Sequence, residues 1–218
     1  MAKPRIGVLG SGDVGRVLGR GFAAAGHAVK LGSRDPDSEK LREWLEDAGE
    51  NARTGTFADA AQFAEIAIFA TLWTGARNAL DLAGPLNLAG KVVVDCTNPL
   101  DFTRGMPPRL ALAGADSGGE QVQRWLPKSR VVKCFNVVGS PHMVNPSFPD
   151  GKPTMFVAGN DEAAKRTVSD LCVELGWPPS LDVGGIEASR YLEAMAMVWV
   201  SVFAQSGSGG HAFALLRK

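Results

Sequence analysis

At 218 residues, the chain has the length of one large domain, or of one domain with an appendage. Its 23 basic and 23 acidic side chains cancel, which argues against a nucleic-acid partner bound through a broad basic face. No uncharged apolar run reaches the roughly 18 residues that a membrane helix needs. The N-terminus lacks the pattern of a secretory signal, and the three separated cysteines form neither a metal motif nor a disulfide framework. The sequence predicts a cytoplasmic protein with no metal, nucleic-acid or membrane partner.

Short apolar runs alternate with amphipathic segments along most of the chain. The runs that predict strands span 5–9, 28–31, 52–56, 66–70, 92–96, 130–135, 154–158 and 180–183. Apolar residues at three- and four-residue steps predict helices over 14–25, 38–49, 58–64, 76–83 and 162–175, with Ser38 and Asp161 as N-caps. Strands that alternate with helices over short connections specify an α/β fold with a doubly wound, mostly parallel sheet.

The last part of the chain has a different pattern. From Ile186 to Leu216 there is no strand signal, apolar residues recur at helical spacing, and 207–210 interrupts them with glycine and serine. We therefore expect a sheet-containing domain over 1–183 and a small helical segment over 184–218. The stretch 104–119, rich in glycine, proline and alanine, is expected to be a long surface loop or lid.

Three glycines follow the first predicted strand and open the first predicted helix. Gly10, Gly12 and Gly15 form a G-x-G-x-x-G motif inside a βαβ unit, which is typical of dinucleotide binding. The first glycine permits a tight turn, the second lets the backbone approach a pyrophosphate, and the third allows close helix–strand packing. The predicted pyrophosphate loop is therefore Gly10-Ser11-Gly12-Asp13-Val14-Gly15. The alternative is a glycine-rich turn that binds no ligand.

The end of the second predicted strand indicates which dinucleotide binds. Enzymes that use NAD place an acidic residue there to hold the ribose hydroxyl, whereas this sequence has Gly32-Ser33-Arg34. A guanidinium can pair with a 2′-phosphate and stack on adenine, and the hydroxyl of Ser33 can bind the same phosphate. These residues favour NADP over NAD. The alternative is that Arg34 pairs with Asp35 on the surface.

Polar residues follow three further predicted strands at the edge where open α/β sheets bind ligands. They are Thr71-Leu72-Trp73, Thr97-Asn98-Pro99 and Asn136. We expect the first two groups to flank the ribose and nicotinamide, and Asn136 to face the nicotinamide edge. The alternatives are that Trp73 is a partly buried core aromatic and that Asn136 hydrogen-bonds its own backbone in a turn.

Two side chains are candidates for a catalytic role, namely Asn136 and His142. Of the three histidines, only His142 lies in a loop at the carboxyl edge of the predicted sheet, and its alternative is a solvated loop side chain. Tyr191 is the sole tyrosine, and position 195 is methionine, so the tyrosine–lysine proton relay of many carbonyl reductases is absent.

An ordered set of motifs resembles the family of NADP oxidoreductases that use the deazaflavin coenzyme F420, over nearly the whole chain. The motifs are Ile6–Gly15, Gly32-Ser33-Arg34, Asn98-Pro99-Leu100, Phe135-Asn136 and Ser189-Arg190-Tyr191-Leu192-Glu193. The resemblance implies a Rossmann domain, a small C-terminal helical domain, a dimer, and hydride transfer between NADP and coenzyme F420 or a flavin in a cleft between the domains. Archaeal members carry histidine where this chain has Asn136, and Pro-Ala where it has Gly139-Ser140.

The leading hypothesis is therefore an NADPH-dependent oxidoreductase with a small-molecule electron acceptor. One alternative is reduction of a ferric chelate, an imine or a carbonyl, although 218 residues leave little room for the long helical domain of imine reductases. Another is a non-catalytic NADP(H) sensor. The segment after Ile186 is apolar on nearly all sides, so a second subunit, or the loop over 104–119, is expected to cover it.

Overall fold

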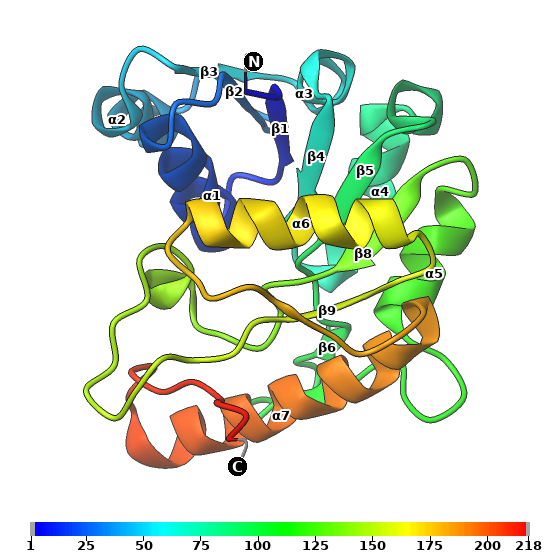
Figure 1. Ribbon diagram of the computed structural model, residues 1–218. Helices are drawn as coiled ribbons and strands as arrows, with labels where there is room; N and C mark the ends of the chain where they lie inside the picture. Colours follow the sequence, from blue (N-terminus) through cyan, green and yellow to red (C-terminus); the bar gives the residue numbers. More distant parts are fainter. Residues whose placement is uncertain (1–2, 217–218) are drawn as a thin grey trace.

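A computed structural model describes residues 3–216 and centres on one eight-stranded sheet (Figure 1). The ends of the two predicted units, 1–2 and 217–218, lie outside the described residues. The strand order is β10-β9-β8-β5-β4-β1-β2-β3. The strands are β1 Ile6–Leu9, β2 Val29–Gly32, β3 Ala52–Gly55, β4 Ile66–Phe69, β5 Val92–Asp95, β8 Arg130–Lys133, β9 Phe156–Gly159 and β10 Leu181–Asp182. Within this sheet β8 and β9 pair antiparallel and the other neighbours pair parallel, which confirms the predicted doubly wound fold.

Helices cover both faces of the sheet. They are α1 Asp13–Ala24, α2 Glu39–Ala48, α3 Phe57–Phe63, α4 Trp73–Ala83, α5 Gly118–Trp125, α6 Glu162–Glu174 and α7 Ser189–Ser206, with short 3-10 turns at Pro85–Leu88, Ser140–His142 and Ile186–Ala188. The apolar sides of α1, α2 and α6 pack on one face, and those of α3, α4 and α5 pack on the other. Because both faces are covered, β1, β4 and β5 are buried at every residue, and apart from Asp95 at the end of β5 they carry no polar side chain.

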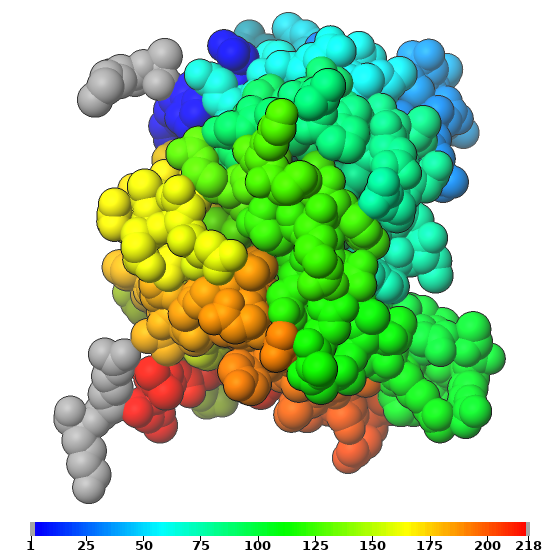
Figure 2. Space-filling view, turned by 90° about the vertical axis from the view of Figure 1, so that its right-hand side faces the viewer, coloured from blue at the N-terminus to red at the C-terminus, as the bar shows by residue number. Residues whose placement is uncertain are grey.

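The stretch 104–119 is more ordered than predicted. It contains β7 Arg109–Leu110, which pairs antiparallel with β6 Leu100–Asp101, and it runs into α5, a helix that the sequence analysis did not predict. The hydroxyl of Ser117 accepts a hydrogen bond from the backbone N–H of Glu120 and donates one to the carboxylate of that residue, which caps the helix. Figure 2 shows the segment around the β6–β7 hairpin projecting beside α7 at the lower right.

Other boundaries shift by a few residues. The fourth helix begins at Trp73 rather than at 76, and the strand predicted over 154–158 spans Phe156–Gly159. Asp161 caps α6 as predicted, through a bond from the N–H of Ala164. Ser38 occupies the N-cap position of α2, but its hydroxyl donates instead to the carbonyl of Asp35.

The long helix α7 crosses below the carboxyl ends of the strands (Figure 1). Gly207, with a φ of 68°, ends it in the left-handed conformation. The chain then returns towards the sheet, where the N–H of Thr154 donates to the carbonyl of Phe213 and the N–H of Leu215 donates to the hydroxyl of Thr154. Among residues 3–216, no helix combines the length and hydropathy needed to cross a membrane.

Candidate functional site

A cleft runs along the carboxyl edge of the sheet. It consists of two adjoining cavities of about 480 and 430 Å³ that share Gly12, Ala70, Thr71, Leu72 and Thr74 in their walls. The first cavity lies over the ends of β1 and β2, and the second lies over the ends of β4, β5 and β8 and against α7. The cleft therefore extends from the glycine-rich turn to the C-terminal helix.

The absence of a side chain matters at each of the three glycines of the turn, for different physical reasons. Gly10 has a φ of +134°, and a Cβ there would lie 2.1 Å from the carbonyl oxygen of Ala70. A Cβ at Gly15 would lie 1.9 Å from the carbonyl oxygen of Gly10. Both residues are therefore required by the fold itself. Gly12 has an ordinary φ of −73°, and a Cβ there would meet nothing within 4 Å. Its missing side chain leaves open space at the N-terminus of α1, where free N–H groups favour an anion.

The first cavity combines this turn with the end of β2. The hydroxyl oxygens of Ser11 and Ser33 lie 3.2 Å apart, and Ser33 also accepts from the N–H of Asp35. Arg34 is exposed at the mouth, and no carboxylate among residues 3–216 forms an ion pair with it. The alternative of an Arg34–Asp35 pair is therefore wrong for this structure. The guanidinium is free to meet an anionic ligand.

The second cavity holds buried polar atoms that lack partners. The side-chain N–H₂ of Asn136 donates to Oδ1 of Asn98 and to the carbonyl of Leu192, whereas its own Oδ1 is buried without a partner. The hydroxyl of Thr71 is likewise buried and unpaired. Buried polar atoms are normally satisfied, so these two are positioned for a ligand. Phe135, buried with a φ of 62°, makes the strained turn that brings Asn136 to this edge.

The remaining wall of the second cavity is apolar and largely aromatic. It is formed by Trp73, Leu100, Phe102, Val138, Ala196, Trp199 and Val200. Trp73 both lines the cavity and stacks on Trp125, at 5.4 Å between ring centroids, so it belongs to the core as well. Trp199 stacks on His211 and Phe203 and donates through Nε1 to the carbonyl of His211. The segment after α7 thus holds the Trp199 ring in place.

Not every predicted site residue lies in the cleft. Gly10, Ser11, Gly12, Ser33, Arg34, Thr71 and Leu72 line the first cavity, and Asp13, Val14, Trp73, Asn98 and Asn136 line the second. Gly15 is buried against the carbonyl of Gly10, Pro99 is buried beside Gly118, and neither residue lines a cavity. His142 packs against Phe148 and lines neither cavity, so its position does not support a catalytic role. In the described part of the chain, no group of three potential ligands is arranged to hold a metal ion.

A buried cluster of charged side chains, which the sequence analysis missed, lies next to Thr97 in the wall of the second cavity. Lys133, fully buried at the end of β8, places Nζ 2.8 Å from a carboxylate oxygen of Asp95 and 2.8 Å from one of Glu193. We call these three residues the Lys133 cluster. Burial opposes the charge of Lys133, but the two carboxylates outweigh it and raise its pKa above the ordinary value. A lysine inside an apolar strand was the available signal, because such a lysine requires buried partners.

The doubly wound sheet and the glycine-rich turn define a dinucleotide-binding protein of the Rossmann type. The sequence profile of the family described as NADP oxidoreductase, coenzyme F420-dependent, matches residues 5–99. A solved structure from Arthrobacter sp. FB24, provisionally assigned as an F420-dependent NADP reductase, is 38% identical with a TM-score of 0.93, over 99% of this chain and 100% of that one. The chain belongs to this family of coenzyme F420-dependent NADP oxidoreductases.

Two curated relatives differ in how much of their own length this chain matches. The F420-dependent NADP reductase of Methanothermobacter marburgensis is 28% identical over 91% of this chain and 92% of its own length. The metalloreductase STEAP3 of Rattus norvegicus is 31% identical over 89% of this chain, but this chain spans only 36% of that protein. The expectation of an NADP-dependent oxidoreductase is confirmed, and the relatives differ in the acceptors that their names specify.

Proposed function

We propose that the protein transfers a hydride from NADPH to a flat, flavin-like or deazaflavin acceptor. The observation that carries this proposal is the division of one cleft into a half lined by the glycine-rich turn, Ser33 and Arg34 and a half with an aromatic wall. NADPH supplies the hydride when bound, so the chain has only to bind and orient the two reactants and to exclude water. The apolar wall around Trp199 suits a planar ring system placed against the nicotinamide.

The predicted cofactor residues fit this assignment. We propose that Gly10 to Gly15 and the N-terminus of α1 hold the pyrophosphate, and that Ser33 and Arg34 hold the 2′-phosphate. Thr71, Leu72, Trp73 and Asn98 would line the ribose and nicotinamide, with Pro99 behind them. The unpaired Oδ1 of Asn136 would accept a hydrogen bond from the nicotinamide carboxamide. Asn136 would thus orient the ring rather than exchange a proton.

The acceptor is tested by measuring NADPH oxidation with a deazaflavin, with FMN, with riboflavin and with ferric chelates. Turnover with a deazaflavin or a flavin supports the proposal. Turnover with the ferric chelate alone would favour a metal acceptor, as the name of the metalloreductase relative suggests. Tight NADPH binding with no turnover in any assay would instead favour a sensor.

The division of the chain into a unit over 1–183 and a helical segment over 184–218 stays a prediction, as does the cytoplasmic location.

We expect Arg34→Ala to weaken NADPH binding by roughly tenfold or more and to leave NADH binding nearly unchanged, because it removes a charge-assisted contact to the 2′-phosphate. Titration calorimetry with both nucleotides measures the effect. Arg42→Ala, which removes an exposed arginine of α2 outside the cleft, serves as the matched control and should change neither affinity. Equal losses for NADPH and NADH would contradict the assignment.

We also propose that the outer face of α7 contacts a second copy of the chain. Tyr191, Val198 and Val202 are 75%, 54% and 42% exposed, although β7 packs against part of the helix. The helix carries no charged side chain after Glu193, so the part of this face around Val198 and Val202 is uncharged as well as apolar. Sedimentation at micromolar concentration should give twice the mass of the chain, and Val198→Asp should give the single mass. A monomeric wild-type protein would remove this proposal.

A further inference from the structure

The Lys133 cluster joins four elements at one buried point. Asp95 ends β5, Lys133 ends β8, and Glu193 reaches up from α7. The two carboxylate oxygens of Glu193 accept from the backbone N–H groups of Gly118 and Gly119, each at 2.9 Å, at the start of α5. The cluster therefore fixes α5 and α7 to the carboxyl ends of two central strands.

The cluster also holds the backbone of the second cavity. Oδ1 of Asp95 accepts from the N–H and the hydroxyl of Thr97, at 2.9 and 2.7 Å, and Nζ of Lys133 donates to the carbonyl of Thr97 at 2.8 Å. All three polar groups of Thr97 are thus bound by the cluster. Because Thr97 lines the cavity and directly precedes Asn98, the cluster fixes the position of the backbone from which the Asn98 side chain extends.

A second connection reaches Asn136 from α7. The carbonyl of Leu192, directly before Glu193, accepts from the side-chain N–H₂ of Asn136 at 3.1 Å. Asn98 and Asn136 are hydrogen-bonded to each other in both directions, at 2.8 and 2.9 Å. The pair is therefore held through Thr97 on one side and through α7 on the other. The three residues of the Lys133 cluster line neither cavity themselves, but the residues they hold, Thr97, Asn98 and Asn136, line the second cavity and not the first.

We infer that Asp95, Lys133 and Glu193 are positioning residues for the nicotinamide half of the cleft alone, setting the Asn98–Asn136 pair against the α7 wall. The inference rests on the proposed binding of NADPH. Hydride transfer requires the two rings to be held at close approach, and small displacements of supporting groups reduce it strongly. The cluster is fully buried, its lysine is paired with both carboxylates, and it makes five hydrogen bonds to the backbone or side chain of Thr97 and to the backbone of Gly118 and Gly119, so it is a rigid support.

The test compares two ligands that differ at the nicotinamide. Adenosine 2′,5′-bisphosphate carries the adenosine and the 2′-phosphate but no nicotinamide, so it probes the first cavity only. Glu193→Gln keeps the shape of the side chain and loses one of its two acceptor oxygens. We expect this variant to bind the bisphosphate like the wild type, and NADPH roughly tenfold more weakly or with a mobile ring. Calorimetry gives the affinities, and the fluorescence anisotropy decay of bound NADPH reports ring mobility.

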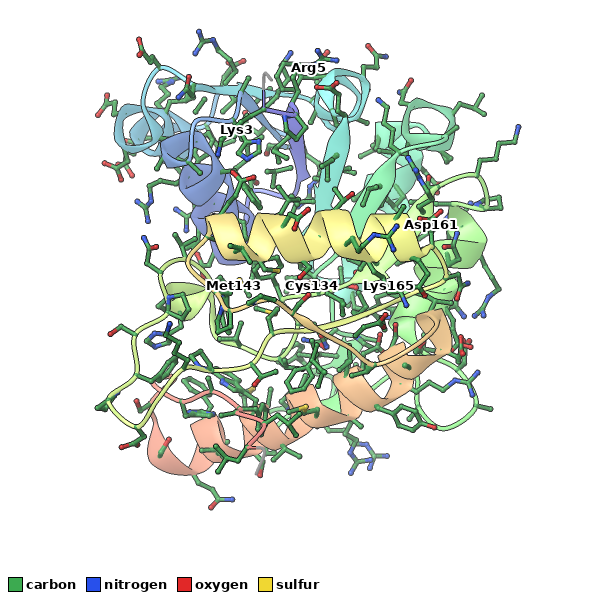
Figure 3. The ribbon with its side chains drawn as sticks, in the orientation of Figure 1. Lys3, Arg5, Cys134, Met143, Asp161 and Lys165 are labelled. Carbon is green, nitrogen blue, oxygen red and sulfur yellow. The ribbon has the colours of Figure 1, made fainter. Side chains whose placement is uncertain are left out.

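A second variant and a control complete the experiment. Asp95→Asn neutralises the other carboxylate, retains an acceptor for Thr97, and should show the same selective effect. Lys165, on α6 and labelled in Figure 3, is a second buried lysine with two carboxylate partners, Glu162 at 2.8 Å and Asp182 at 2.6 Å, away from the cleft. Lys165→Gln should leave both ligands and the ring mobility unchanged.

Each remaining outcome overturns the inference. The cluster has no positioning role if its variants bind both ligands more weakly by the same factor, or if neither affinity nor ring mobility changes. The same holds if Lys165→Gln shows the same selective loss of NADPH affinity. Unfolding of both cluster variants would give it a role in the fold alone. Failure of the wild type to bind NADPH would instead refute the proposed function, so the two failures are distinguishable.

Discussion

Replacing Gly12 by valine should abolish the binding of both NADPH and NADH while the protein stays folded. The backbone of Gly12 is in an ordinary conformation, and its ideal Cβ has no neighbour within 4 Å, so the chain itself tolerates a side chain there. A valine would project into the space shared by the two cavities, where the pyrophosphate is proposed to bind. We expect a loss of affinity of roughly 100-fold or more for both nucleotides, which a steric clash at the phosphates would produce.

Gly10→Ala provides the contrast for this prediction. An alanine Cβ at Gly10 would meet the carbonyl of Ala70 at 2.1 Å, and the φ of +134° is strained for any side chain. This variant should lose thermal stability, whereas Gly12→Val should melt close to the wild type. Normal NADPH binding by a folded Gly12→Val protein would show that the phosphates lie elsewhere.

Lys133→Met should destabilise the fold by about 3 kcal/mol or more, because it leaves the carboxylates of Asp95 and Glu193 buried without their cation. Urea unfolding followed by circular dichroism measures the change. In Lys165→Met, the matched variant, Glu162 and Asp182 remain partly exposed, so water can solvate them and the loss should be much smaller. Equal losses in the two variants would contradict this account.

The pH dependence of the Lys133 contribution follows from the direction of its shift. The pKa of Lys133 is raised above its ordinary value of 10.5, since attraction to Asp95 and Glu193 outweighs burial. A group with a raised pKa contributes its full stabilisation below the unfolded value and loses it as the pH rises through the folded value. Wild-type stability should therefore lose this contribution only in strongly alkaline solution, and unfolding measured at neutral pH captures all of it.

The first half of the fold was predictable because its signals are local. The change from an apolar run to a helical period around Gly10 and Gly15 marks the first strand–turn–helix unit, and continuous apolar runs mark β4 and most of β5. Ser33 and Arg34 could be predicted to lie at the ligand-binding edge for the same reason, since residues that directly follow a strand of such a sheet fall at that edge.

Elements that depend on distant contacts were missed. α5 begins with Gly118-Gly119, a weak helix start, and its N-terminus is held by Glu193, which lies more than 70 positions further along the chain. The local signal that could have revealed this helix was the spacing of Ser117 and Glu120, a serine followed three residues later by glutamate, which is typical of a helix N-terminus. β6 and β7 have two residues each, too few to show the alternating pattern of a strand. Lys133, Asp95 and Glu193 are far apart in the sequence, so no local pattern links them.

The anchoring of Trp199 has a practical consequence for preparing the enzyme. One wall of the cleft depends on His211, which lies 12 positions later in the chain and bonds to both the indole N–H and the backbone carbonyl of Trp199. Truncation after Gly207 would remove that support from the half of the cleft that Trp199 lines, and none of the removed residues lines the other half. The first and the last described residues lie at opposite ends of the molecule (Figure 1). An affinity tag for kinetic work therefore belongs at the N-terminal end, beyond the reach of the aromatic wall.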